Sequence, residues 1–464
     1  MRHVAALGII AVLTGTWNPV PAQTPLQPVH HVYPTSTLQE IQQAIDDGGT
    51  VFFHDGEYNQ IASSTPDLPP TPANPAKGFN IGKYGNDVNI IGLPGPNGER
   101  PKINGGTVAF RVGLLPGYGF AGLPVNFSIE NLELFNPDLA GPDVLYSRVG
   151  IFVVDRIGTR TTIRNCKITV TGKDTDPGTA NNHSSAIWIR LMGAQTLADG
   201  ARIDITDNEI TGTRILAGIV FGHFRAEGPT YIPPRLRIGG NSIEAARLRG
   251  YAGTGAAIFL AGNHSNSVVA NNAIRGDARS PGFTAVTSAI RYARSGQLPS
   301  SNITVAGNDA SGFIGDVQLL LDRTVSGGAI TGNAFGAAVQ VGAMVYGSDN
   351  RIGQNHFYGA YPGWESAASG PGLFWFANTT ASTSHGNTLV ASKLNGPPHG
   401  FDICSQVFDE TDIPVTPGYD GANKIPAYEK CETKSVEFQQ RMQERKAALD
   451  ARFTQGYGAE RPPQ

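Results

Sequence analysis

The sequence has few charged residues and few cysteines, and it lacks both a long apolar segment and a basic cluster. Charged side chains make up 16% of the 464 residues, and 35 basic residues nearly balance 38 acidic ones. Without a dense Lys/Arg tract that would follow a phosphate backbone, nucleic acid is excluded as the expected partner. After the N-terminal region, no segment reaches the roughly 18 uninterrupted apolar residues typical of a membrane-spanning helix. We therefore expect no integral membrane segment in the mature chain.

The three cysteines have no CxxC or Cys/His spacing, which argues against a structural zinc site. Cys166 lies in a strand-like run from Ile163 to Val170, so we expect it to be a small buried residue. Cys404 and Cys431 lie in a loop-rich tail and are the candidates for a disulfide in an exported protein. The sequence leaves open whether they are bridged.

The N-terminus has the pattern of a signal peptide. Arg2 and His3 precede an apolar run from Val4 to Leu13, and the small-residue sequence Val20-Pro21-Ala22 precedes Gln23. We predict a signal peptide over residues 1–22 and a periplasmic or secreted mature protein. An uncleaved membrane anchor is the alternative, but the apolar run is short for a bilayer.

Glycine, in contrast, is abundant at 58 residues, and a short asparagine motif recurs along the chain. In each copy apolar residues flank the asparagine, as in Ile129-Glu130-Asn131-Leu132-Glu133-Leu134. The copies are 22 (333 to 355) to 43 (165 to 208) residues apart, and a second apolar run, first at 150–153 and last at 372–375, follows each of them. The shortest period is near the length of a bare three-strand coil, so this pattern predicts an all-β, right-handed parallel β-helix with loops inserted in the longer coils. The repeated asparagines are Asn131, Asn165, Asn208, Asn241, Asn272, Asn308, Asn333 and Asn355.

Asparagine suits the corner of such a coil for two physical reasons. It tolerates left-handed backbone geometry better than other non-glycine residues. In stacked coils, successive amides lie above one another and form a hydrogen-bonded ladder. We therefore expect these asparagines to stabilise the scaffold.

The two ends of the chain depart from the repeat. Thr37-Leu38-Gln39-Glu40 is a capping box that predicts a helix over 36–47. This helix, the strand after it and Gly56-Glu57-Tyr58 resemble the N-terminal cap of the pectate-lyase-like β-helix superfamily. The resemblance is one of architecture over about residues 36–395, and it implies that the helix closes one end of the solenoid. We place the β-helix at 30–395 and a Pro/Gly-rich tail at 396–464, with a helix over about 435–453.

The repeat spacing also predicts where loops are inserted. In the second apolar run, Val339 lies 6 positions after Asn333, but Ile187 lies 22 positions after Asn165. Loops that enter at the same point of stacked coils emerge on the same side. We therefore expect a ligand groove beside the sheet formed by the second apolar runs, because side chains fill the interior of a β-helix.

Outward positions of that sheet, and residues just after it, combine aromatic rings with Arg, His and Gln. These residue types suit sugar rings and uronate carboxylates, so a polysaccharide is the expected partner. The alternative is that loops or the C-terminal helix simply cover the aromatic side chains. The predicted substrate-binding residues are Trp188, Phe152, Phe259, His264, Arg294 and Gln318.

The resemblance implies polysaccharide lyases, epimerases and hydrolases as enzyme classes. A lyase needs a base and a cation that neutralises the uronate carboxylate, and the candidate catalytic residues are His223, Arg190 and Arg291. Ca²⁺ is an alternative neutraliser, although no metal ligands are predicted. The motifs of polygalacturonases and alginate epimerases and the acidic calcium cluster of pectate lyases are absent.

Three hypotheses follow. The first is a lyase acting on an acidic polysaccharide, and the second is a non-catalytic glycan-binding or envelope-associated β-helix. The third is a polysaccharide hydrolase or epimerase. We expect a monomer in each case.

Overall fold

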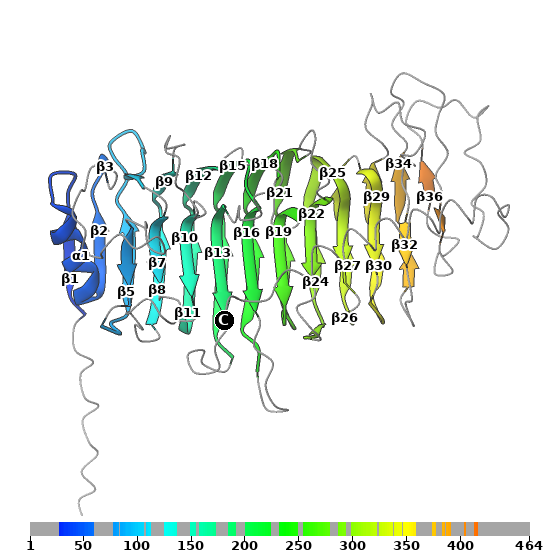
Figure 1. The fold of residues 1–464 in the computed structure, drawn as a ribbon, viewed down its shortest axis with the longest axis horizontal. Coiled ribbons are helices and arrows are strands. Elements are labelled where there is room, and N and C mark those ends of the chain that lie inside the picture. Colours follow the sequence, from blue (N-terminus) through cyan, green and yellow to red (C-terminus); the bar gives the residue numbers. More distant parts are fainter. Residues whose placement is uncertain are drawn as a thin grey trace, which may run out of the picture.

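Each turn of the chain adds one strand to each of three parallel sheets, and the turns stack into a long solenoid (Figure 1). The computed structural model describes residues 27–59, 78–82, 84–105, 108–112, 125–136, 149–154, 157–172, 184–191, 200–223, 232–248, 254–278, 286–293, 298–322, 324–336, 338–345, 347–358, 374–376, 383–385, 387–390, 403–404 and 413–415. Every strand pairing within these residues is parallel, and each strand pairs with its counterpart in the next coil, as β11 does with β14 and β12 does with β15. The protein is therefore a parallel β-helix.

Sheet A has 12 strands that are hydrogen-bonded in chain order. They are β1 Val29–Val32, β2 Gly49–Phe53, β5 Val88–Gly92, β8 Val125–Glu130, β11 Ile157–Arg164, β14 Arg202–Thr206, β17 Arg235–Gly239, β20 Val268–Ala270, β24 Thr304–Ala306, β27 Ala329–Thr331, β30 Arg351–Gly353 and β33 Thr383–His385.

Sheets B and C share the long strand β25, Asp309–Leu321, which bends from one sheet into the other. The other strands of sheet B are β3 Glu57–Asn59, β6 Lys102–Asn104, β9 Glu133–Asn136, β12 Lys167–Thr171, β15 Glu209–Thr213, β18 Ser242–Ala246, β21 Ala273–Asp277, β28 Ala334–Phe335, β31 His356–Tyr358, β34 Thr388–Val390 and β36 Ile413–Val415.

The other strands of sheet C are β4 Phe79–Ile81, β7 Val108–Val112, β10 Val149–Val154, β13 Ser185–Leu191, β16 Ala217–His223, β19 Thr254–Gly262, β22 Val286–Ala293, β29 Ala338–Val345, β32 Phe374–Phe376 and β35 Ile403–Cys404. Two short strands, β23 Ser300–Ser301 and β26 Val325–Ser326, form a separate pair.

The asparagine motif and the second apolar run together account for the three sheets. The motif spans the end of a sheet A strand and the start of a sheet B strand, as in β8 and β9, and the second apolar run is a sheet C strand, as in β10. One short motif thus contains two strands with a corner between them, which is why the sequence shows only two apolar runs per coil.

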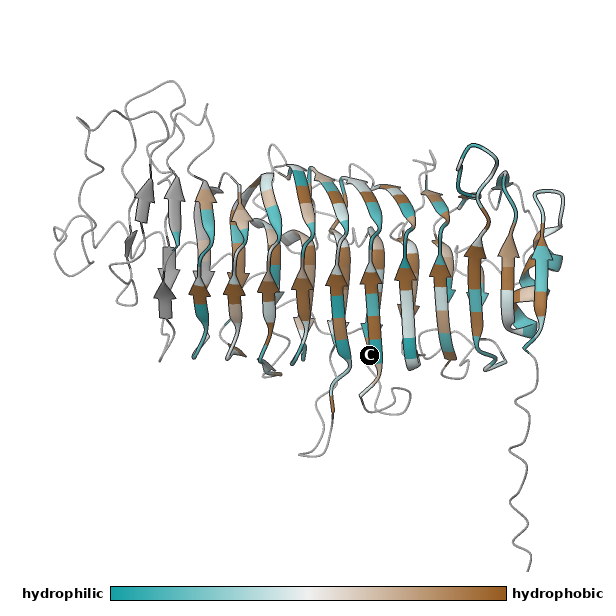
Figure 2. Cartoon of the chain, turned by 180° about the vertical axis from the view of Figure 1, so that it is seen from behind, coloured by the Kyte–Doolittle hydropathy of each residue, from teal (hydrophilic) through white to brown (hydrophobic). Residues whose placement is uncertain are grey.

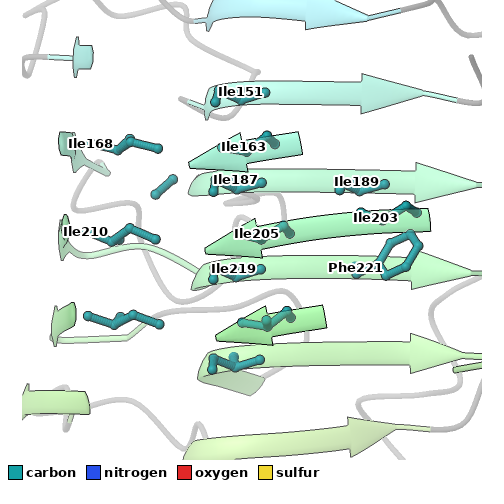
Figure 3. Close-up of a cluster of buried hydrophobic side chains, with 14 of the residues drawn as sticks. Ile151, Ile163, Ile168, Ile187, Ile189, Ile203, Ile205, Ile210, Ile219 and Phe221 are labelled. Carbon is teal, nitrogen blue, oxygen red and sulfur yellow. The ribbon is translucent and has the colours of Figure 1, made fainter. Parts of the chain in front are cut away.

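Stacked aliphatic side chains fill the interior. Ile151, Ile187 and Ile219 pair in register along sheet C, and each is fully buried. Figure 3 shows them facing the isoleucines of sheets A and B across the core, and Figure 2 shows apolar bands at matching heights in neighbouring strands. Successive strand residues alternate between the two faces of a sheet, so these columns point inward while the residues between them face outward.

The predicted N-terminal helix is confirmed as α1, Leu38–Asp47. Thr37 is its N-cap, and the capping box is complete: the Glu40 backbone N–H donates to the Thr37 hydroxyl at 3.2 Å, and the Thr37 N–H donates to the Glu40 carboxylate at 2.7 Å. Its buried residues Ile41 and Ile45 join the core, and α1 packs on β1, β2 and β4 at the end of the solenoid.

The predicted corner geometry is shifted by one residue in most coils. Asn131 and Asn165 have positive φ as expected, but in later coils the left-handed residue is the one before the repeated asparagine. Gly240, for example, has a φ of 68° and precedes Asn241. Strand register shows that the position directly after the left-handed residue is equivalent in these coils. Its occupants are Leu132, Cys166, Asn208, Asn241, Asn272, Asn308, Asn333, Asn355 and Asn387.

The last seven of these residues form a continuous asparagine ladder, which confirms the predicted stacking. In each rung the backbone N–H and the Nδ2 of one asparagine both donate to the Oδ1 of the next; for Asn241 and Asn272 these distances are 3.1 and 2.9 Å. The same Nδ2 also donates to a strand carbonyl of the preceding coil, which for Asn272 is that of Ile238. Sequence inspection missed the final member, Asn387, which accepts from Asn355.

Cys166 occupies the rung before the ladder begins, and it is buried and free as predicted. Its N–H donates to Asn208 Oδ1 at 3.0 Å, and its Sγ lies 3.6 and 3.3 Å from the carbonyl oxygens of Ile129 and Arg164. These are the equivalents of the carbonyls that Nδ2 of Asn272 contacts. Burial raises the pKa of the thiol to about 12, so it is a neutral donor.

Cys166→Asn is expected to extend the ladder by one rung and to raise the free energy of unfolding by about 1 kcal/mol, since amide hydrogen bonds would replace weak thiol contacts. Urea denaturation followed by circular dichroism measures the change. Cys166→Ala is the matched control and should lower stability. An asparagine variant no more stable than the alanine variant would contradict the equivalence of these positions.

Other predictions about the ends fall partly beyond the described residues. The signal peptide at 1–22, the helix at 435–453 and Cys431 lie outside them, whereas Cys404 lies in β35. Strand pairing continues past residue 395, because β35 pairs with β32 and β36 pairs with β34.

Candidate functional site on the outer face of sheet C

One row of side chains on the outer face of sheet C combines aromatic residues with arginine. Strand register aligns these residues along the solenoid axis, one from each coil, with the coils about 4.8 Å apart. We call them the outer row of sheet C: Arg111, Phe152, Trp188, Val220, Phe259 and Arg291.

Members of the outer row contact one another. The ring centroids of Phe152 and Trp188 are 5.3 Å apart, and the guanidinium carbon of Arg291 lies 5.2 Å from the centroid of Phe259. Val220 and Phe259 belong to an apolar cluster that is separate from the interior core. Trp188 packs against this outer cluster. The outer face of sheet C therefore has an apolar surface of its own, bordered by arginines.

Exposure differs along this face. Phe152, Trp188 and Arg190 are half-buried, and Arg190 lies two residues beyond Trp188 on the same strand. Phe259 and Arg291, with exposed fractions of 7% and 1%, are buried. Of the predicted catalytic residues, Arg190 and Arg291 thus share a face with the predicted aromatic residues.

Long connections both precede and follow strands of sheet C along the chain. The connections from sheet B to sheet C include 172–184 and 278–285, as predicted. Those from sheet C to sheet A, which the sequence analysis did not consider, include 113–124, 192–201 and 224–234. From β8 to β31 the corner between sheets A and B is short, so the long connections in these coils precede or follow a strand of sheet C.

His223 and His264 are not on this face. His223 is the last residue of β16, follows the inward-facing Ile219 and Phe221, and is fully buried; His264 is 2% exposed. Their ring centroids are 6.2 Å apart, and the His264 ring contacts that of Phe221 at 4.9 Å. The predicted placement of His223 beside the outer face is therefore wrong, because strand alternation turns it toward the core.

Each of these histidines is held by a backbone carbonyl. His223 Nδ1–H donates to Asn263, and His264 Nε2–H donates to Ala261 at 2.8 Å. Burial, with a smaller contribution from His223, lowers the pKa of His264 to about 3. The pair is therefore an internal packing feature, and neither ring is positioned to contact a polysaccharide.

Gln318 is also placed differently from the prediction. Arg291 pairs with Leu320, so Leu320 occupies the outer row in β25. Gln318 aligns with the core residue Ala289, is fully buried and donates from Nε2 to the Phe313 carbonyl at 3.2 Å. The sequence pattern misplaced Gln318 because it gave no sign of the irregular bend in β25. Arg294 lies outside the described residues.

Sequence inspection missed three arginines around this face. Arg111 extends the outer row, and burial lowers its pKa to about 10. Arg214 and Arg247 lie at the corner from sheet B to sheet C in successive coils with positive φ, 59° and 49°, although left-handed geometry costs about 1–2 kcal/mol for such residues. Strained positions often accompany functional sites. Only strand register could have found Arg111, and residue type gives no signal for a left-handed arginine.

The described residues do not fit a calcium ion. No group of three His, Cys, Asp or Glu side chains in this part of the chain is arranged to hold a metal. The same residues include no helix long and apolar enough to span a bilayer.

Comparison with known proteins finds similarity at the level of three-dimensional structure. No family model matches the sequence, and no curated protein matches it. Among solved structures, the Dettilon tailspike protein matches with a TM-score of 0.51 and 12% identity over 83% of this chain and 68% of the tailspike. The two proteins share the parallel β-helix fold.

Two weaker similarities have TM-scores below 0.5. A surface adhesin of Streptococcus pneumoniae has a TM-score of 0.44 and 13% identity over 78% of this chain and 90% of its own. A mannuronic acid specific polysaccharide family 6 lyase from human gut microbiota has a TM-score of 0.43 and 10% identity over 91% of this chain and 95% of the lyase. The function has to be argued from the residues of this chain.

Proposed function

We propose that this protein binds an acidic polysaccharide along the outer face of sheet C. The observation that supports the proposal is the outer row itself, in which Arg111 and Arg291 flank aromatic and apolar side chains in register. Aromatic faces pack on the apolar faces of sugar rings, and guanidinium groups bind carboxylates in a bidentate manner.

The geometry of the solenoid favours a polymer over a small ligand. Each coil contributes one outer-row residue about every 4.8 Å along a straight line, a spacing comparable with one sugar unit of an extended chain. A polysaccharide that follows the axis would meet the half-buried rings of Phe152 and Trp188 in neighbouring coils. Arg190, half-buried beside Trp188, is a further partner for a uronate carboxylate.

Cleavage of the same polymer by β-elimination is the second candidate. In this reaction a base removes the proton beside the uronate carboxylate, the double bond forms, and the glycosidic oxygen leaves. Arg111 favours this candidate because burial lowers its pKa to about 10, which brings its neutral form within closer reach. Arg190, which is half-buried on this face, would neutralise the carboxylate. We also propose that the protein acts after export, on the basis of the signal-peptide pattern at residues 1–22.

Trp188→Ala is expected to weaken binding of a uronate polysaccharide about 10-fold, because it removes a large, half-buried aromatic ring of the outer row. Isothermal titration calorimetry against polygalacturonate and alginate oligosaccharides measures the affinity. Phe135→Ala is the matched control: Phe135 is a half-buried aromatic residue on the outer face of sheet B, with Lys102 Nζ 5.0 Å from its ring. It should leave binding unchanged.

The same samples test the lyase candidate through the ultraviolet absorbance of an unsaturated product. Binding without absorbance would leave the glycan-binding proposal in place and remove the lyase. No binding to any uronate polymer, or equal losses for Trp188→Ala and Phe135→Ala, would overturn the proposal for sheet C.

A further inference from the structure

The outer face of sheet A carries a strip of small polar side chains between longer charged ones. Ser128, Thr162 and Asp204 lie in register on β8, β11 and β14, and they are only 7%, 9% and 7% exposed although they alternate with the inward-facing core residues. We call these three residues the polar strip of sheet A.

Arginines dominate the borders of the polar strip. Arg160, Arg202 and Arg235 are in register on three successive strands and are exposed. Arg237, also exposed, continues the line of the strip after Asp204. On the opposite border, Arg164 pairs with Glu130 at 2.7 Å.

Few of these charges are neutralised within the protein. Arg202 Nε donates to Asp204 Oδ2 at 2.6 Å. Arg160, Arg235 and Arg237 form no ion pair in the part of the chain that the structure describes. Three exposed guanidinium groups therefore lie within two coils of one another, and none forms an ion pair with an acidic side chain of the described residues. Like charges at such spacing repel, so a bound anion would relieve a local cost.

Asp204 adds a second, independent feature. Its Oδ1 is buried and accepts no hydrogen bond from the described residues. A buried carboxylate oxygen without a donor costs free energy, typically about 1–3 kcal/mol. A ligand that carries both anionic groups and hydroxyl donors would satisfy the arginines and this oxygen at once.

We propose that Arg160, Arg235, Arg237 and the free oxygen of Asp204 form a second glycan site, on sheet A, for an acidic sugar. The arginines bind carboxylate groups of neighbouring sugar units, and Asp204 Oδ1 accepts a hydrogen bond from a sugar hydroxyl. This site is on a different face from the outer row of sheet C and does not depend on it.

The combination of groups favours an acidic sugar over a polyanion without hydroxyls. Arginines alone would attract any polyanion, including nucleic acid or polyphosphate. A carboxylate in their midst repels such ligands and rewards a hydroxyl donor, which a uronic acid carries beside its carboxylate. Asp204 is therefore the residue that confers selectivity.

The test compares the affinities of full-length protein for polygalacturonate and for polyacrylate, which has carboxylates but no hydroxyls. All measurements use the Trp188→Ala background, so that binding to sheet C is suppressed. An Arg235→Gln/Arg237→Gln double variant should weaken binding of both polymers about 10-fold or more, because two charge-assisted contacts are lost. Asp204→Asn should weaken polygalacturonate binding about 5-fold and leave polyacrylate binding unchanged or stronger, since the amide is a poorer acceptor for a hydroxyl donor but no longer repels anions.

Arg351→Gln is the matched control, because Arg351 is an exposed arginine in line with Arg237 on the same face, several coils away. It should change neither affinity. The proposal would be overturned if the double variant and Arg351→Gln lose the same amount of affinity. It would also be overturned if Asp204→Asn weakens the binding of polygalacturonate and of polyacrylate equally. Single-stranded DNA that binds as tightly as polygalacturonate would also overturn it, by showing attraction of any polyanion. If the Trp188→Ala variant without further substitutions no longer binds polygalacturonate, sheet C is the site of binding and the proposal for sheet A fails.

Discussion

Asn272→Ala is expected to lower the free energy of unfolding by about 4 kcal/mol, a large part of the total stability of a typical domain. The Asn272 side chain accepts two hydrogen bonds from Asn241 and donates to Asn308 Oδ1 and to the carbonyls of Ile238 and Ala270. Alanine would leave the buried backbone N–H of Asn241 without its acceptor and would remove the side-chain hydrogen bonds that join three consecutive coils. Urea denaturation followed by circular dichroism measures the loss.

The adjacent residue is a stringent control, since Asn271→Ala is the same substitution one position earlier. Asn271 is exposed and has a φ of 55°. Alanine there should cost only about 1 kcal/mol, the penalty for a left-handed backbone without asparagine. Similar losses for the two variants would show that the ladder contributes no more than the corner geometry.

Acidification between pH 6.5 and 3 should destabilise the protein through His264 by about 1.4 kcal/mol per pH unit. Burial lowers the pKa of His264 to about 3, whereas its ordinary value is 6.5. In this interval the unfolded chain binds a proton that the folded chain excludes. The contribution of neutral His264 to the free energy of unfolding is therefore complete above pH 6.5 and is lost as the pH falls toward 3. The neighbouring groups, His223 and Tyr292, provide no negative charge near the ring to offset the cost.

His264→Gln should flatten the pH dependence of the unfolding free energy by that slope, even though the lost packing lowers stability at neutral pH. His356→Gln is the control, since His356 is exposed on sheet B and its solvation changes little on unfolding. An unchanged slope in His264→Gln would mean that His264 is protonated without cost and is not held in the core as described.

The fold could be predicted because its determinants are local and repeated. The motif around Ile238, Gly240 and Asn241 contains an inward-facing residue, a left-handed corner and a ladder amide within four residues, and each coil repeats it. The capping box at Thr37 and Glu40 is equally local. Errors of one position, such as Asn208 for Asp207 at the corner, arose because both residue types tolerate left-handed geometry.

The candidate site was harder to predict because the direction of a side chain depends on strand alternation and on bends. Trp188, Phe152 and Phe259 were identified because each follows a buried isoleucine or valine by one residue. His223 and Gln318 were misplaced because the same reasoning could not follow β16 to its end or the bend in β25. The neighbours of Arg111, Thr162 and Asp204 come from other coils tens of residues away, and no local pattern records them.

The sequence by itself determined the repeating coil, its corner amides, its capping helix and the presence of long insertions near the second apolar runs. These features depend on contacts within one coil or on a repeat that the chain displays many times. Only the tertiary structure decided which side chains lie on each face: the histidines in the core, the arginine and aromatic row on sheet C, and Asp204 among arginines on sheet A. Strand register sets these neighbours, and register is fixed by the packing of whole coils rather than by any single segment.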